Sequence, residues 1–388
     1  MGPGPYRRGS ALTAGSRIVQ LDLLRGLVVV IMALDHVAFF VAKRHPAEFW
    51  NVPLPQYPHA LAFFTRAITH LSAPGFFLLM GAGMALFYRS RTELGWSQGR
   101  LVRYFAVRGL VLVAINQLIE NPAWAIGFFT TAPGAFWPPA AMSGTTADVV
   151  FIAGVLTGLG LSMAIAGLML RLPTAVLLVS GLAAIGASQL LLADSGSHGF
   201  WARLLNAPGV TGRVYILYAV LPWLGVTLCG VALGRWMGKL PRSIGAIGLI
   251  LGVVLIAVFA GLRAKGGFGN HHAIPGPTLI DFLNMTKYPP SMAFLALTLG
   301  INLMLLGLLP RLPAALRNVL VIYGKAPLCC YLAHIWLFAL VGLLFRQGTG
   351  YGVLYVVWDV GLVPLFYICK RYSAFKQAKP LESRWRML

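Results

Sequence analysis

Two neighbouring apolar segments near the start of the chain carry side chains that can exchange protons. Residues 23–42, LLRGLVVVIMALDHVAFFVA, contain Arg25, Asp35 and His36, and the segment FFTRAITHLSAPGFFLLMG places Arg66 and His70 one helical turn apart. A charged side chain at membrane depth costs at least ~2.5–3.5 kcal/mol on insertion scales, so such residues usually face the protein interior. We therefore expect these two segments to form the walls of a polar site inside the membrane.

Two kinds of chemistry suit this group of residues. A histidine can remove the proton of an attacking amine or hydroxyl during acyl transfer, while a carboxylate orients it. Alternatively, aspartate and histidine side chains at the membrane midplane relay protons in a transporter of a small organic anion. His36 and His70 are the candidate bases. Asp35 lies about 100° around the helix from His36, so we expect Asp35 to serve His70 or another helix. The residue types leave open which histidine is the base.

Three more polar residues are placed near this group by their distance from flanking charges. His334 lies nine residues beyond Lys325, which puts it at about the depth of His36 at ~1.5 Å per residue. Asp148 and Lys287 lie nearer the outer face. A single buried histidine is often only a hydrogen-bonding residue, and a lysine near a membrane surface often only extends toward water. The residues that we expect to bind substrate are Arg66, Thr69, Asp148, Lys287 and His334.

The composition is that of a membrane protein. The chain has 388 residues, of which 58% are hydrophobic and 11% charged, and its net charge is +21. A nucleic-acid-binding protein gathers basic residues on one soluble face, whereas most basic residues here lie in short loops on one side of apolar segments. We therefore expect no nucleic-acid partner. Topology explains these charges, but Arg25, Arg100, Arg103 and Arg108 also suit the phosphates of a coenzyme A ester on the inner side.

The apolar segments predict an all-α fold, a polytopic membrane bundle of about ten transmembrane helices with both termini cytoplasmic. The segments lie at 23–42, 67–88, 101–119, 148–170, 173–192, 214–236, 243–262, 290–309, 326–345 and 351–369. We expect a disordered cytoplasmic leader at 1–16, one transmembrane domain at 17–372 and a basic cytoplasmic tail at 373–388. The first segment lacks a following cleavage motif, so we interpret it as a retained helix. The four cysteines form no spaced pairs, and we expect neither a disulfide framework nor a metal site.

Five blocks of sequence, taken in order, resemble one family. LDLLRGLVVVIMALDH, FFTRAITHLSAPGFFLLMGAG, LPWLGVTLCGVALGR, NMTKYPPSMAFLALTLG and YGKAPLCCYLAHIWL are similar to bacterial relatives of heparan-alpha-glucosaminide N-acetyltransferase, within a wider transmembrane acyltransferase superfamily. The resemblance implies a helical membrane enzyme that takes acetyl from acetyl-CoA on the inner side and hands it to an acceptor on the outer side. It also implies a fold similar to a homodimeric bundle.

The resemblance further implies which residues form the site. The family's active site uses an asparagine late in the first span, where Asp35 stands here, and a histidine before the second span, for which His59 is the approximate match. The bacterial subgroup resembles a site built around an Asp-His pair and a Thr-Arg…Thr-His run. In this chain those motifs correspond to Asp35, His36, Thr65, Arg66, Thr69 and His70.

The residues and the resemblance together favour an acyltransferase of the bacterial inner membrane. We expect it to move an acetyl group from cytoplasmic acetyl-CoA to a periplasm-facing amino sugar, glycan or lipid-linked acceptor, without a metal. In this hypothesis His36 or His70 is the base, Asp35 orients a histidine, and Arg66 binds the developing oxyanion or an acidic acceptor. The lipid bilayer and a second copy of the chain are the other expected partners. The alternative is the organic-anion transporter.

Overall fold

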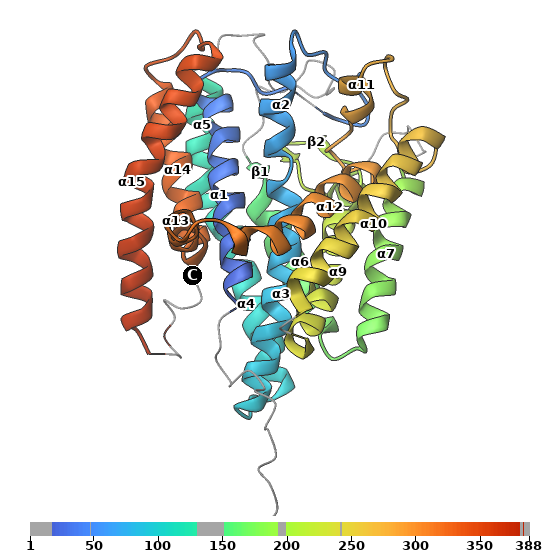
Figure 1. Ribbon diagram of the computed structural model, residues 1–388, viewed down its shortest axis with the longest axis vertical. Helices are drawn as coiled ribbons and strands as arrows, with labels where there is room; N and C mark the ends of the chain where they lie inside the picture. The colour runs from blue at the N-terminus through green and yellow to red at the C-terminus, as the bar shows by residue number, and fades with distance from the viewer. Residues whose placement is uncertain are drawn as a thin grey trace, which may run out of the picture.

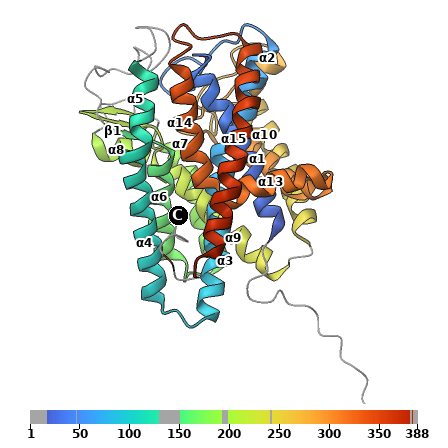
Figure 2. The same ribbon diagram turned by 90° about the vertical axis from the view of Figure 1, so that its left-hand side faces the viewer.

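The structure is a computed structural model that describes residues 18–46, 48–129, 151–192, 199–240, 243–380 and 383. The longer helices run roughly side by side and form a bundle, and α13 lies across it (Figure 1, Figure 2). The helices are α1 (Val19–Phe40), α2 (Ala60–Thr69), α3 (Ser72–Glu93), α4 (Gln98–Ile115), the π-helical turn η1 (Asn116–Glu120), α5 (Asn121–Phe129), α6 (Val155–Met169), α7 (Thr174–Leu190), α8 (Phe200–Leu205), α9 (Val220–Lys239), α10 (Ile244–Lys265), α11 (Leu279–Leu283), α12 (Met292–Leu308), the 3₁₀ turn η4 (Leu309–Arg311), α13 (Ala314–Lys325), α14 (Pro327–Gly342) and α15 (Tyr351–Ala378).

The chain is a polytopic helical membrane protein. Within the part of the chain that the structure describes, seven helices are long and apolar enough to cross a membrane, and α13 with α14 adds an eighth if this pair, bent by 88°, is one span. The apolar helices α6 and α7 are shorter than these. Eight of the ten predicted segments coincide with helices or parts of helices, whereas the described part of 148–170 and the segment 214–236 each begin with a three-residue strand that precedes the helix. The number of spans and the side of the termini stay predictions.

Helix α1 lies at the centre of the bundle, in contact with α3, α13, α14 and α15. It approaches α13 so closely that a Cβ atom at Gly26 would collide with the carbonyl oxygen of Leu320, and a Cβ at Gly324 would collide with that of Asp22. Small residues at such crossings let two membrane helices pack backbone against backbone. This contact fixes the position of α1 along its axis, and therefore of Asp35 and His36 near its C-terminal end, relative to the C-terminal helices.

The second apolar segment is divided into α2 and α3. Helix α2 ends at Thr69 and α3 begins at Ser72, so the break falls at His70, four residues before Pro74. Proline has no amide hydrogen and cannot bond the carbonyl four residues earlier, which explains why the helix breaks there. At this interruption the His70 side chain contacts Glu48 of the loop between α1 and α2.

A small sheet departs from the expected all-α fold. The strands β1 (Phe151–Ala153), β2 (Gly209–Thr211) and β3 (Val214–Ile216) pair in the order β1-β3-β2, with β1 parallel and β2 antiparallel to β3. The strands β1 and β3 lie within the predicted segments 148–170 and 214–236, so the prediction that these residues are helical was wrong, and β2 lies in the connection before β3. A three-residue strand is too short to show an alternating pattern, which is why the sequence did not indicate it. The sheet supplies Ile152 and Tyr215 to the wall of the site described below.

Candidate active site

A buried ion network surrounds Arg66 at the end of α2. Its Nε donates to Glu48 Oε1 at 2.7 Å and its Nη2 to Glu48 Oε2 at 2.5 Å, so the guanidinium holds this carboxylate with both arms. Its Nη1 donates to Asp35 Oδ1 at 2.5 Å, and the Thr69 hydroxyl donates to the same oxygen at 2.8 Å. His70 Nε2 contacts Glu48 Oε1 at 3.1 Å. Such charge-assisted, bidentate contacts fix both geometry and orientation.

The loop between α1 and α2 positions the acidic part of this network. The carbonyl of Glu48 accepts from the backbone amides of Lys287 and Tyr288, each at 3.0 Å, so the loop is attached to the segment before α12. Burial alone would raise the pKa of Glu48, but the charges of Arg66 and His70 beside it hold this pKa well below its ordinary value. Glu48 is therefore a permanent counter-charge for Arg66.

His45 lies in the same loop and contacts both Arg66 and Asp35. Its Nε2 is 2.8 Å from Arg66 Nη1 and 3.3 Å from Asp35 Oδ2. Since a guanidinium can only donate, the shorter contact makes this nitrogen an acceptor, and it cannot also donate to Asp35. Burial and the nearby Arg66 lower the pKa of His45, in keeping with a neutral ring. The Nε2 lone pair of His45 is thus occupied by Arg66.

His36 is paired with a histidine from α14, 298 residues away. Its Nδ1 lies 2.6 Å from Nε2 of His334, and Nδ1 of His334 lies 2.8 Å from the carbonyl oxygen of Cys330. A carbonyl only accepts, so the proton of a neutral His334 is on Nδ1, and its Nε2 accepts from Nδ1 of His36. In this arrangement Nε2 of His36 keeps its lone pair and is the basic nitrogen.

Both histidine clusters face a cavity of about 60 Å³, which we call the outer cavity because the sequence places its residues toward the expected outer side. Asp35, His36, His45, Thr69 and Lys287 line it, whereas His70 and Arg66 stand behind these residues and are not part of its lining. The aromatic rings of Phe39, Trp124, Tyr218 and Tyr288 complete much of its wall. The sequence therefore identified four of these polar lining residues and missed His45.

Lys287 is a buried cation on the surface of this cavity. Its side chain is 2% exposed and its ammonium lies 5.1 Å from the centre of the Tyr288 ring, and it forms no ion pair within the described residues. Burial and the charge of Arg66 lower the pKa of Lys287 to about 8. A buried ammonium facing a cavity is suited to an anionic group or to negative charge that develops there during a reaction.

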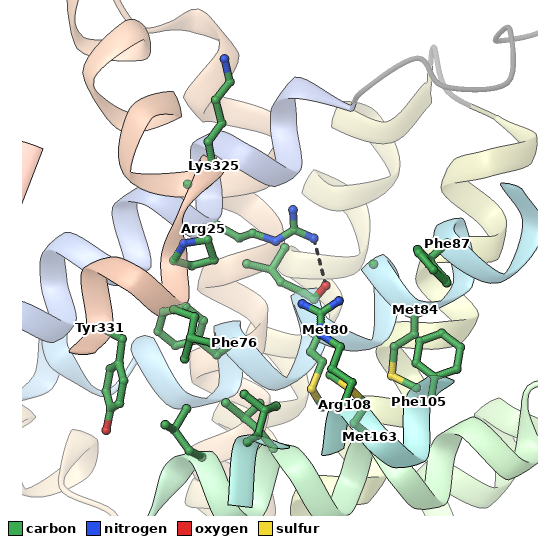
Figure 3. A pocket seen from close by; sticks show the side chains of 18 of the residues that line it. Arg25, Phe76, Met80, Met84, Phe87, Phe105, Arg108, Met163, Lys325 and Tyr331 are labelled. Atoms are coloured by element: carbon green, nitrogen blue, oxygen red, sulfur yellow. Dashed lines mark hydrogen bonds between the residues drawn. The ribbon is translucent and has the colours of Figure 1, made fainter. Parts of the chain in front are cut away.

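A second, larger cavity of about 570 Å³ lies on the other side of these residues. Figure 3 shows its wall, with Arg25, Arg108 and Lys325 around it and Tyr331 at one end. The cationic residues along it are Arg25, Arg91, Arg100, Arg108, Lys325 and Lys376. The Arg100 guanidinium lies 3.9 Å from the centre of the Trp96 ring, and Phe87 stacks on Tyr104 at 4.5 Å. Cations and aromatic faces together suit a nucleotide with several phosphates.

The predicted residues differ in how they relate to the two cavities. Arg103 is exposed on α4 and is not among the residues lining either of them, unlike Arg100 and Arg108. Asp148 lies outside the described residues. His59 is exposed and caps the N-terminus of α2, where its Nδ1 accepts from the amide of Ala62 at 3.1 Å. The histidine that the structure brings to Asp35 is His45, whereas His59 is not among the residues lining the outer cavity.

A buried glutamate that the sequence analysis missed lies across the outer cavity from Asp35. Glu120 ends the π-helical turn η1, and its Oε1 accepts from the hydroxyl of Tyr331 at 2.6 Å and from Nε1 of Trp124 at 2.9 Å. Its other oxygen, Oε2, is buried and has no hydrogen-bond partner among the described residues. The π-helical turn is a recurrent feature of functional sites, but single-sequence periodicity does not indicate it.

The comparison with protein families identifies the family of the chain. Residues 17–252, more than half of the chain, match the family described as heparan-alpha-glucosaminide N-acetyltransferase, catalytic. The chain belongs to this family. Membership in the heparan-alpha-glucosaminide N-acetyltransferase family supports membrane acetyltransferase activity in general, and acetyl-CoA is the general donor in that family. The matched residues include Asp35, His36, His45 and Arg66 and end before Lys287. A search of curated proteins found none that matches the chain.

Proposed function

We propose that this protein transfers an acetyl group from acetyl-CoA in the larger cavity to an acceptor in the outer cavity, across the bacterial inner membrane. The larger cavity then faces the cytoplasm and the outer cavity the periplasm, where an amino sugar, a glycan or a lipid-linked sugar enters. The observation that carries this proposal is that a cavity rich in cations and aromatic rings adjoins a small cavity lined by His36 and Asp35.

In the proposed reaction His36 is the base. Its Nε2 takes the proton of the acceptor amine or hydroxyl as that group attacks the thioester carbonyl carbon. The negative charge on the carbonyl oxygen of the tetrahedral intermediate is stabilised by the Lys287 ammonium. The carbon–sulfur bond then breaks, coenzyme A leaves as the thiolate, and the sulfur takes the proton from His36. His334 holds the His36 ring in the tautomer that this step needs.

The other charged residues determine the electric field around His36. Arg66 uses its nitrogens on Glu48, Asp35 and His45, so it orients those groups and Lys287 takes the role first expected of Arg66. Asp35 counters the two cations Arg66 and Lys287 at the edge of the cavity. Holding such groups in place before the substrate arrives is the main way in which a buried polar site stabilises a transition state.

The decisive experiment follows labelled acetyl from acetyl-CoA to a panel of amino-sugar, glycan and lipid-linked acceptors, using purified protein in detergent or in vesicles. We expect transfer to at least one acceptor, and a melting temperature that rises with acetyl-CoA concentration because the ligand binds the folded protein. Indifference to acetyl-CoA, combined with uptake of an organic anion into vesicles, would establish the transporter instead.

If acetyl-CoA binds in the larger cavity, two arginines that line it should contribute to its affinity. The double substitution Arg100→Ala and Arg108→Ala should weaken acetyl-CoA binding about 10²-fold or more, because each charged phosphate contact contributes about 1.5–3 kcal/mol. The measurement is the acetyl-CoA concentration that gives half-maximal thermal stabilisation. Arg103→Ala is the matched control, since Arg103 lies on the same helix and does not line the cavity. Equal effects of the control and the double variant would show that the donor binds elsewhere.

Because Lys287 lines the outer cavity, we expect kcat/KM to depend on pH. With a pKa of about 8, this lysine is charged below pH 8 and becomes neutral above it. Stabilisation of negative charge is therefore present at neutral pH and lost as the pH rises, so kcat/KM should fall above pH 8. Lys287→Gln should lower kcat/KM at pH 7 by about tenfold or more and remove this alkaline decline. A decline that persists unchanged in Lys287→Gln would assign it to another group.

A further inference from the structure

The two cavities meet at a wall of four side chains. Among the described residues, Met32 of α1, Phe76 of α3, Val155 of α6 and Tyr331 of α14 line both cavities. The wall is apolar apart from the hydroxyl of Tyr331. His36 lies directly beyond it, with its ring centre 5.9 Å from that of Tyr331. A thioester that enters from the larger cavity and meets a nucleophile activated by His36 must therefore place its carbonyl at this wall.

Tyr331 is held in place from two sides. Its hydroxyl donates to Glu120 Oε1 at 2.6 Å, and Glu120 is itself fixed by Nε1 of Trp124. Its ring also lies edge-on to His334, with 5.4 Å between the ring centres. A buried side chain with a strong hydrogen bond at its tip and rings at its edge has little freedom to move aside. The wall at Tyr331 is therefore a fixed boundary.

The space beyond this wall is small. The larger cavity, of about 570 Å³, accepts a bulky donor, whereas the outer cavity offers about 60 Å³. One water molecule requires about 10–15 Å³ of such volume, so the outer cavity has room for only a few water molecules. An acyl tail attached to a carbonyl at the wall shares this space with the reacting group of the acceptor. An acetyl methyl group fits there, and a chain of several methylenes does not.

We propose that Tyr331, anchored by Glu120, sets the acyl-length limit of the enzyme and, with Met32, Phe76 and Val155, excludes acyl groups much longer than acetyl. This inference rests on the proposed function, since it assigns a specificity-determining residue to the proposed transfer. The expected ligand is a short, unbranched acyl thioester of coenzyme A whose tail lies against the ring of Tyr331. The hydrogen bond to Glu120 matters because without it the ring of Tyr331 is free to turn away from the wall and leave room for a longer acyl tail.

The test compares kcat/KM for acetyl-CoA, butyryl-CoA and hexanoyl-CoA with one acceptor. We expect the wild-type protein to favour acetyl-CoA over hexanoyl-CoA by about 10²-fold or more, since each methylene that a pocket rejects is worth about 10–200-fold. Tyr331→Ala should reduce this ratio at least tenfold, and Glu120→Ala should reduce it in the same direction. Tyr104→Ala is the matched control, because Tyr104 lines the larger cavity away from the wall. Its acetyl-to-hexanoyl ratio should stay that of the wild type.

A second variant keeps the inference testable if Tyr331→Ala does not fold. Met32→Ala opens the same wall from α1, and elution as a single peak in detergent verifies that it is folded. An unchanged acetyl-to-hexanoyl ratio in both folded Met32→Ala and folded Tyr331→Ala, or an equal change in Tyr104→Ala, would overturn the inference. The proposed function fails separately, if the wild-type protein transfers no acyl group from any of the three thioesters.

Discussion

Replacing His36 with alanine should lower turnover by about 10²-fold or more while acetyl-CoA still binds. The loss is the size typical of removing a general base. His36 is the histidine that we expect to accept the proton because it lines the outer cavity and its Nε2 has no hydrogen-bond partner among the described residues. The measurement is transfer of labelled acetyl at saturating acetyl-CoA, with binding followed separately by thermal stabilisation.

Other histidines provide the controls for this result. His59→Ala should turn over like the wild type, since His59 is exposed at the start of α2. His334→Ala should cost less than His36→Ala, because it removes the group that orients the base and leaves the base itself. His70→Ala should also cost less, since His70 contacts Glu48 and does not line the cavity. Loss of activity in His45→Ala with normal turnover in His36→Ala would make His45 the base.

The sequence predicted the part of the site that lies on regular helices. Asp35, Arg66 and Thr69 fall on α1 and α2, and titratable residues inside apolar helices can be recognised because burying them is costly. Depth counted along the helices also placed His36 and His334 at one level, and the structure joins them at 2.6 Å. What the count could not show is that they touch, because the pattern of one helix carries no information about its neighbour.

The missed residues lie where helical periodicity is absent. His45 and Glu48 belong to the connection between α1 and α2, and a loop has no repeat from which the direction of a side chain can be inferred. Glu48 pairs with Arg66 across 18 residues, and the same Arg66 was expected to bind substrate because its partner was not apparent. Glu120 directly follows the predicted segment 101–119, and an acidic residue at the end of an apolar segment carries no sign of its partner. Only the three-dimensional contact with Tyr331 shows that it faces the site.

The bend between α13 and α14 shows the same limitation at the level of the fold. The apolar pattern predicted one span at 326–345, and it is occupied mainly by α14. The preceding α13 is an amphipathic helix that turns by 88° into α14 at Ala326–Pro327 and packs against α1. This contact depends on the close approach at Gly26, a tertiary feature that a hydropathy pattern does not contain. This contact between α13 and α1 nevertheless determines where His334 lies along the bundle, opposite His36.

Asp35→Asn should lower turnover by about 10²-fold with acetyl-CoA binding retained. The substitution keeps the shape of the side chain, and its amide oxygen can still accept from Thr69 and Arg66. It removes the negative charge that balances Arg66 and Lys287 at the cavity, and its amide nitrogen would donate to His45 and compete with Arg66 for that lone pair. Removing one partner from a buried, paired set of charges is usually costly because the remaining charges stay desolvated.

A matched aspartate separates this effect from a general loss of charge on α1. Asp22 is also buried on α1 and lies 3.3 Å from Arg25, which lines the larger cavity where acetyl-CoA is proposed to bind. Asp22→Asn should therefore change acetyl-CoA binding more than turnover, the opposite of Asp35→Asn. Turnover of Asp35→Asn within about threefold of the wild type at saturating acetyl-CoA would mean that the charge of Asp35 is not needed for catalysis. The network around Arg66 would then serve to hold α2 and the His45 loop in place.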